Sequence, residues 1–185
     1  MKSSPRNASG SRPFETYLAL ARRAGTREAR IIPARSVVTA EWVRFKCQYG
    51  CDGYGKRLCC PPCTPTPEQT RRMIAGYRSA LIYTYPAPSR DRSRAHRRMQ
   101  KLVAGLERAM FLDGFYKAFG FCAGPCRLCP TCDPSGRCKL PDLARPAMEA
   151  CGIDVYATCR NAGIELKVVT RLDAESKHVN LILID

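Results

Sequence analysis

Histidine, tryptophan and acidic residues are scarce in this sequence of 185 residues, which has 2 His, 1 Trp and 16 Asp plus Glu against 31 Lys plus Arg. His96 and His178 are isolated, and neither lies at ligand spacing from the cysteines. No Ser-His-Asp set, Walker loop or dinucleotide fingerprint is present. No apolar run has the length of a transmembrane helix, and the N-terminal residues lack the apolar core of a signal peptide. We therefore expect a cytoplasmic protein without a membrane segment.

Cysteine, in contrast, is abundant, with 12 residues, of which ten lie in segments 47–63 and 122–138. A small cysteine-rich chain can be a secreted scaffold held together by disulfides. Without a signal peptide, a reducing compartment is the better expectation, and there closely spaced cysteines indicate metal binding or catalysis. The sequence therefore predicts a metal-binding protein.

The second cysteine group follows the pattern C-x2-C-x2-C-x5-C, formed by Cys126, Cys129, Cys132 and Cys138. Ferredoxin-type iron–sulfur loops have short spacers of this kind. Zinc ribbons more often pair two C-x2-C knuckles across a longer stretch. The spacing favours a [4Fe–4S] cluster here, with Zn²⁺ as the alternative.

The first cysteine group offers five thiols, although a site of either type needs at most four. We expect Cys47, Cys51 and Cys60 to be ligands, with Cys59 or Cys63 as candidates for the fourth. Iron–sulfur and zinc are about equally compatible with this group, and one site shared between both groups is a further alternative. If no fourth thiolate joins, one coordination position stays open.

The order of the motifs resembles a family of small prokaryotic proteins described only as predicted metal-binding proteins of unknown function. The resemblance rests on RFKCQYGCDGYGKRLCCPP, TPEQTRRM, GPCRLCPTC with a fourth Cys, and RPAMEACGIDVYATCRNAG. It implies two sets of site residues in the cysteine motifs, Cys47, Cys51 and Cys60 in the first and Cys126, Cys129, Cys132 and Cys138 in the second. It also implies Arg145, Pro146, Met148 and Glu149. Cys59, Cys63, Cys122, Cys151 and Cys159 fall outside the pattern.

The composition of residues 1–13, rich in Ser, Pro, Arg and Asn, predicts a flexible basic tail. Helical periodicity begins near Phe14, and we expect a single metal-binding domain at 14–185. We expect an α+β fold with a mixed, mostly antiparallel sheet packed with helices, and two cysteine-rich metal-binding loops. Predicted helices cover 14–24, 67–79, 89–112, 145–150 and 155–161. Predicted strands cover 29–32, 37–45, 80–85 and 116–121, with a closing hairpin of 165–170 and 178–184.

The helix predicted at 89–112 is amphipathic and strongly basic. Its expected buried stripe is Ala95, Met99, Leu102, Leu106 and Ala109, and its expected solvent face is Arg94, Arg97, Arg98, Lys101 and Arg108. Segment 94–108 would suit nucleic acid or an acidic redox partner, although a solvated face is the simpler interpretation. Farther along, Arg145 and Glu149 stand at i and i+4 and are expected to pair.

Taken together, these features favour a cytoplasmic protein with one or two [4Fe–4S] clusters that serves in electron transfer or as an accessory to a redox enzyme, and therefore has a redox partner protein. One alternative is a zinc-binding module for nucleic acid or protein. Another is a metalloenzyme with an open coordination site at the first cysteine group.

Overall fold

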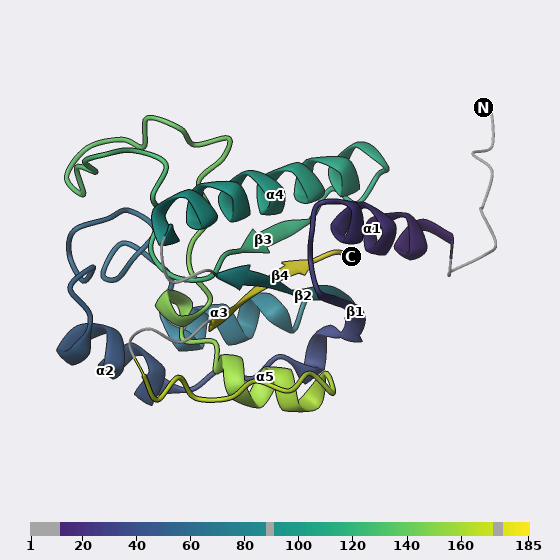
Figure 1. Cartoon of the computed structure of the whole chain (residues 1–185), viewed down its shortest axis with the longest axis horizontal. Helices are drawn as coiled ribbons and strands as arrows, with labels where there is room; N and C mark the ends of the chain where they lie inside the picture. The colour runs from purple at the N-terminus through teal and green to yellow at the C-terminus, as the bar shows by residue number, and fades with distance from the viewer. Residues whose placement is uncertain (1–11, 88–90, 172–175) are drawn as a thin grey trace.

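The computed structural model describes residues 12–87, 91–171 and 176–185 (Figure 1). The α-helices are α1 (Arg12–Arg23), α2 (Glu41–Gly50), α3 (Pro67–Ile74), α4 (Arg92–Leu112) and α5 (Val155–Asn161). The strands are β1 (Glu28–Pro33), β2 (Ser79–Ala87), β3 (Phe119–Phe121) and β4 (Ser176–Leu183), and two short 3₁₀ helices are η1 (Ala34–Ser36) and η2 (Glu149–Cys151).

The strands form one four-stranded sheet in the order β1-β2-β4-β3, and each neighbouring pair is antiparallel. The central strands β2 and β4 are aligned so that Leu81 lies opposite Ile182 and Ile82 opposite Leu181. Successive side chains of a strand point to opposite faces, so this register supplies apolar residues to both sides of the sheet. The predicted α+β fold with a mostly antiparallel sheet is confirmed.

Helices cover both faces of the sheet (Figure 1). On one face, Tyr17 of α1 and Met99 and Leu106 of α4 pack with Leu81 and Ile182. On the other face, a second core gathers α3, α5 and η2 through Ile74, Val155, Cys159, Met148 and Cys151, which pack with Ala80, Ile82, Leu181 and Leu183. Both cores are apolar layers of the kind that hold α+β domains together.

Several predicted elements are confirmed. Thr66 caps α3 in a reciprocal box with Gln69, as the Thr-Pro-Glu-Gln sequence indicates. Helix α4 buries Ala95, Met99 and Leu106, together with Val103 and Met110, while Leu102 and Ala109 are only half-buried. The five cations of its predicted solvent face are exposed. Residues 1–11 and 88–90, which include most of the predicted tail and the expected start of this helix, lie outside the described residues.

The strand predicted at 37–45 is wrong, because most of this segment belongs to helix α2. The alternating residues of this segment do not form a buried face, and Trp42 among them is 46% exposed. In the helical part of the segment Val43 is buried, and Glu41 lies in the first turn, where a carboxylate interacts favourably with the helix dipole. The spacing of Val43, Cys47 and Cys51 by four residues is the helical signal that the prediction missed.

The closing hairpin is also wrong. Strand β4 pairs with β2 and β3, whereas residues 165–170 form no strand. The helix predicted at 145–150 is only the single 3₁₀ turn η2, and α3 ends at Ile74 rather than near residue 79. The pairing of β4 with β2 and β3 replaced the local hairpin that the two closing segments suggested.

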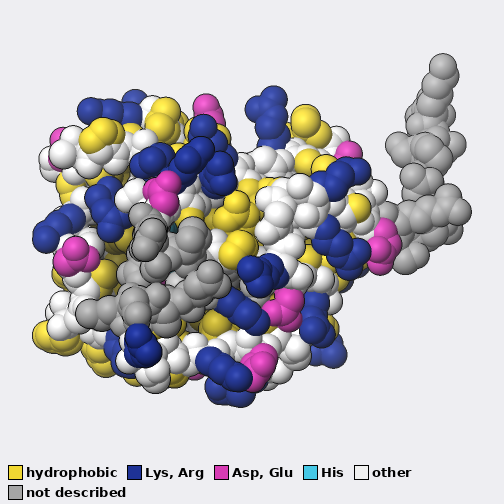
Figure 2. Space-filling model, in the orientation of Figure 1, with side chains coloured by type: hydrophobic (Ala, Val, Ile, Leu, Met, Phe, Trp, Pro, Cys, Tyr) yellow, Lys and Arg dark blue, Asp and Glu magenta, His cyan; other side chains and the backbone are white. Residues whose placement is uncertain are grey.

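Basic side chains outnumber acidic ones on the visible face (Figure 2), in line with the formal charge of +15. The only acidic residue in α4 is Glu107, which pairs with Arg145. Within the described ranges, no helix has the length and apolar character needed to span a bilayer.

Candidate metal centres and the adjoining pocket

Two loops carry the cysteine groups, and they lie side by side next to the sheet. One loop joins α2 to α3, and the other joins β3 to η2. The amide of Leu58 donates a hydrogen bond to Cys132 Sγ at 3.5 Å, and the amide of Ala147 donates to the carbonyl oxygen of Cys59 at 3.3 Å. These contacts bring sulfur atoms from distant parts of the sequence into one region. All twelve cysteines lie in the described part of the chain and are free thiols.

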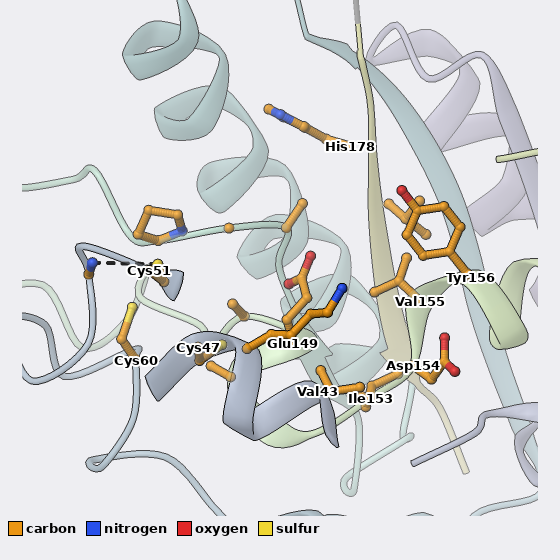
Figure 3. Close-up of a pocket in the computed structure, with 18 of the residues that line it drawn as sticks. Val43, Cys47, Cys51, Cys60, Glu149, Ile153, Asp154, Val155, Tyr156 and His178 are labelled. Carbon is orange, nitrogen blue, oxygen red and sulfur yellow. Dashed lines mark hydrogen bonds between the residues drawn. The ribbon is translucent and has the colours of Figure 1, made fainter. Parts of the chain in front are cut away.

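Helix α2 positions the first two thiols. Cys47 is in its last turn and Cys51 is its C-terminal cap residue, so the four-residue spacing places both on one side of the helix end. Together with Cys60 they line a cavity of about 470 Å³ (Figure 3). The amide of Gly53 donates to Cys51 Sγ at 3.4 Å.

Glycine at position 53 leaves room for these sulfur atoms. A Cβ at this position would lie 3.5 Å from Cys51 Sγ and 3.7 Å from Cys60 Sγ. Both are ordinary van der Waals distances, so a side chain at this position would only narrow the space beside the two thiols. This space and the all-sulfur donor set fit a thiolate-bound metal centre.

The adjacent residues Cys59 and Cys60 serve different cysteine groups. Cys60 faces Cys47 and Cys51, whereas Cys59 hydrogen-bonds to Cys126 and lines a second, smaller cavity of about 30 Å³. This second cavity is also lined by Cys126, Cys129, Cys132 and Cys138. The structure thus brings together each predicted ligand set, and it places Cys59 with the second set rather than the first.

Cys63, the other candidate for a fourth ligand, is exposed and lines neither cavity. Cys122, Cys151 and Cys159 are buried in the two apolar cores, where their thiols pack as small hydrophobic groups. Of the cysteines in the chain, the first cavity therefore receives three, and no fourth thiol faces it.

Burial and neighbouring groups raise the pKa values of Cys47 and Cys60 in the first group and lower that of Cys126 in the second. Burial, followed by the nearby Glu149 and Cys51, raises the pKa of Cys47 to about 11. Burial raises that of Cys60 to about 12. In the second group, the hydrogen bond from Cys59 lowers the pKa of Cys126 to about 6, helped by the Leu128 amide and Arg57. Metal binding by the first group would therefore have to displace protons.

Glu149 lies in the wall of the first cavity, and the predicted Arg145–Glu149 pair is wrong. Arg145 pairs with Glu107 instead, because residues 145–148 are not helical and the two side chains diverge. Figure 3 shows the Glu149 carboxylate pointing into the cavity, between Cys51 and His178. Burial raises the pKa of this carboxyl group.

His96 and His178 also line this cavity, and their ring centroids are 4.6 Å apart. The two histidines are far apart in the sequence, so their proximity could not be predicted. It results from the packing of α4 next to β4. Gly124, on the neighbouring loop, packs against His96: a Cβ there would lie 2.7 Å from Nε2.

Within the described ranges, no three Cys, His, Asp or Glu side chains converge closely enough to bind a metal ion in the conformation seen. The thiols of each group instead surround a cavity.

The chain matches one protein-family model, described as "Predicted metal-binding protein (DUF2284)", over residues 30–184. This range contains every cysteine of both groups and Glu149. No curated protein and no solved structure matches the chain. Because the model covers most of the sequence, this chain belongs to that family of predicted metal-binding proteins of unknown function.

Proposed function

We propose that the protein is a redox protein in which Cys126, Cys129, Cys132 and Cys138 hold a [4Fe–4S] cluster and Cys47, Cys51 and Cys60 hold a second centre. The observation that carries the proposal is the divergence of Cys59 and Cys60. Their Cα atoms are about 3.8 Å apart, yet one thiol faces each group. Two centres so close together are well placed to exchange single electrons.

The spacing and surroundings of the second group support iron–sulfur over zinc. Its loop has the short C-x2-C-x2-C spacing of ferredoxins, and Cys132 Sγ accepts a hydrogen bond from the Leu58 amide. Amide hydrogen bonds to sulfur are one of the means by which proteins set cluster potentials. Arg57 and Arg137 line the same cavity, and their positive charge would favour the reduced state.

The basic face of α4 offers a docking surface for the electron donor or acceptor. Arg94, Arg97, Arg98, Lys101 and Arg108 are exposed, and within the described part of the chain none has a carboxylate at salt-bridge distance. The helix contacts the second cysteine loop through Gln100, which hydrogen-bonds to Arg145. An acidic redox protein would complement this surface. Nucleic acid is the competing partner for the same charges.

Metal analysis of anaerobically purified protein tests the proposal. We expect brown protein with iron and acid-labile sulfide, and a paramagnetic resonance signal after reduction. The Cys126→Ser/Cys129→Ser variant should lose the ferredoxin-like signal and keep the other centre. Cys159→Ser, a buried core cysteine outside both groups, is the control and should keep all the iron. Colourless protein containing zinc would instead support an interaction module.

The first cavity favours a second candidate, a metalloenzyme whose first centre has an open coordination position. Three thiols and no fourth face a space large enough for an organic molecule. A three-thiolate centre can accept a ligand at its remaining position. Added cyanide should then change the resonance signal of the first centre and leave that of the second unchanged. Identical behaviour of both centres would argue for electron transfer alone.

A further inference from the structure

The first cavity holds a buried carboxylate oxygen that finds no hydrogen-bond partner among the described residues. Glu149 Oε2 is inaccessible to solvent, and among the described residues it is the one carboxylate oxygen that is buried and accepts no hydrogen bond. The backbone amide of Gly124 hydrogen-bonds to this side chain without supplying a counter-charge. An uncompensated buried polar atom is costly, so its persistence at a cavity wall indicates a ligand.

The lysines around the cavity do not neutralise Glu149. Lys177 Nζ pairs with Glu28 at 2.9 Å and with the carbonyl oxygen of Glu165 at 3.1 Å. Lys167 Nζ pairs with the Glu165 carboxylate at 3.1 Å and its side chain is 81% exposed. Lys46 Nζ lies 5.4 Å from the ring centroid of Trp42. Each ammonium group is thus engaged with another partner, which leaves His96 and His178 as the other basic side chains of the cavity wall.

The remaining wall suits an organic molecule rather than a bare ion. Apolar side chains line it, among them Val43, Ile153, Val155 and Val179. Trp42, Tyr54 and Tyr156 add aromatic surface, which attracts cations as well as apolar groups. A volume of about 470 Å³ is in the range of small-molecule sites.

Negative charge increases further at the inner end of the cavity when a metal is bound. The thiols of Cys47, Cys51 and Cys60 would then be thiolates, and a cubane with a 2+ core and three thiolates is an anion. Figure 3 shows Glu149 facing the same space as Cys51 and Cys60. Cationic ligands are favoured over anionic ones whether or not the centre is loaded.

We propose that this cavity binds a small organic amine, whose ammonium group pairs with Glu149 and whose apolar body fills the space beside Val155 and Val179. The inference deepens the proposed function, because the amine would lie next to the first metal centre. Its contact with Glu149 does not itself require the metal.

Three probes of similar size but different charge test the proposal: benzylamine, benzyl alcohol and benzoate. Trp42 is the single tryptophan and lines the cavity, so its fluorescence reports occupancy. We expect saturable binding of benzylamine, at least tenfold weaker binding of benzyl alcohol and none of benzoate. Glu149→Gln should weaken benzylamine binding about 10- to 100-fold, the usual worth of a charged hydrogen bond.

Two further variants make the test specific. Glu165→Gln alters an exposed carboxylate near the rim that does not line the cavity, and should keep the affinity of the unmodified protein. Glu149→Asp keeps the charge and should retain part of the binding. Circular dichroism and the unfolding midpoint show whether each variant is folded.

The proposal is overturned if benzoate binds as well as benzylamine, if the alcohol matches the amine, if Glu149→Gln binds normally, or if no probe binds the folded protein. Iron, sulfide and zinc are measured on the same samples. Metal-free protein that binds benzylamine through Glu149 would sustain this inference and reject the proposed function. Metal-loaded protein that does not bind benzylamine would reject this inference and leave the proposed function standing.

Discussion

Arg145 is held by Glu107 through two short hydrogen bonds, in which Nε and Nη2 each donate to a carboxylate oxygen at 2.6 Å. Both side chains are mostly buried, with exposed fractions of 15% and 14%. Glu107 also accepts a hydrogen bond from the amide of Gly120 at 2.7 Å. The pair thus ties the end of the second cysteine loop to helix α4 and strand β3.

Removing one partner of this ion pair should destabilise the protein strongly. We expect Glu107→Ala to lower the free energy of unfolding by about 3 kcal/mol, because the Arg145 charge is left buried and unpaired. The exposed pair of Arg72 and Glu68 is the matched control, and Arg72→Ala should cost less than about 1 kcal/mol. Urea unfolding followed by circular dichroism measures both. Equal effects of the two variants would contradict the structural role of Arg145.

The placement of Cys59 predicts which centre responds to its loss. Cys59→Ser should alter the resonance signal or iron content of the second centre and leave the first unchanged, because its thiol faces Cys126. Cys63→Ser should leave both centres intact, since Cys63 is exposed and lines neither cavity. Loss of the first centre in either variant would show that it recruits that thiol as its fourth ligand.

Cys126 should be the more reactive thiol in metal-free protein. Its pKa is lowered to about 6, so it is mostly thiolate above pH 6, and its alkylation by iodoacetamide should slow as the pH falls through that value. Cys47, whose pKa is raised to about 11, should react appreciably only near that pH. Peptide mapping by mass spectrometry gives both profiles.

The Cys59 thiol is the largest cause of the Cys126 shift. In Cys59→Ala the midpoint for Cys126 alkylation should therefore move upward, toward the ordinary cysteine value of about 8.5. An unchanged midpoint would mean that the Leu128 amide and Arg57 stabilise the thiolate without help from Cys59.

Gly124 occupies a position that other residues would strain. Its φ is +61°, and an added Cβ would approach His96 Nε2 to 2.7 Å. We expect Gly124→Ala to destabilise the fold by about 1–3 kcal/mol. Gly105 in helix α4 has open space around its Cα, so Gly105→Ala should stabilise by about 0.5–1 kcal/mol. Thermal unfolding compares the two, and a shift of the same sign in both would contradict this account.

Sequence patterns within a few residues correctly predicted the helices that depend on such patterns. The Thr66–Gln69 capping box predicted the start of α3, and the apolar stripe of Ala95, Met99 and Leu106 predicted α4. The sheet partners were not predictable in this way. Strand β4 pairs with β2, which lies about a hundred residues earlier in the chain. Both strands are apolar enough to be buried on two faces, but neither sequence indicates which segment will be its partner.

The candidate site likewise has a part that the sequence predicted and a part that it did not. Spacing identified the two cysteine groups and three of the thiols at the first cavity. It did not separate Cys59 from Cys60, because the direction of neighbouring side chains depends on a loop conformation that regular periodicity does not describe. The cavity wall formed by Glu149, His96 and His178 comes from three distant segments, which only the folded sheet assembles.

The central position of β4 has a consequence for how the protein matures. Residues 176–183 lie between β2 and β3, and Asn180 of this strand receives a hydrogen bond from the Ala123 amide at 3.0 Å. The loop that bears the second cysteine group is therefore anchored to a segment that leaves the ribosome after both groups have emerged. Until β4 has been synthesised, the sheet that anchors this loop is incomplete, so the arrangement of the two cysteine groups described here can form only late in folding.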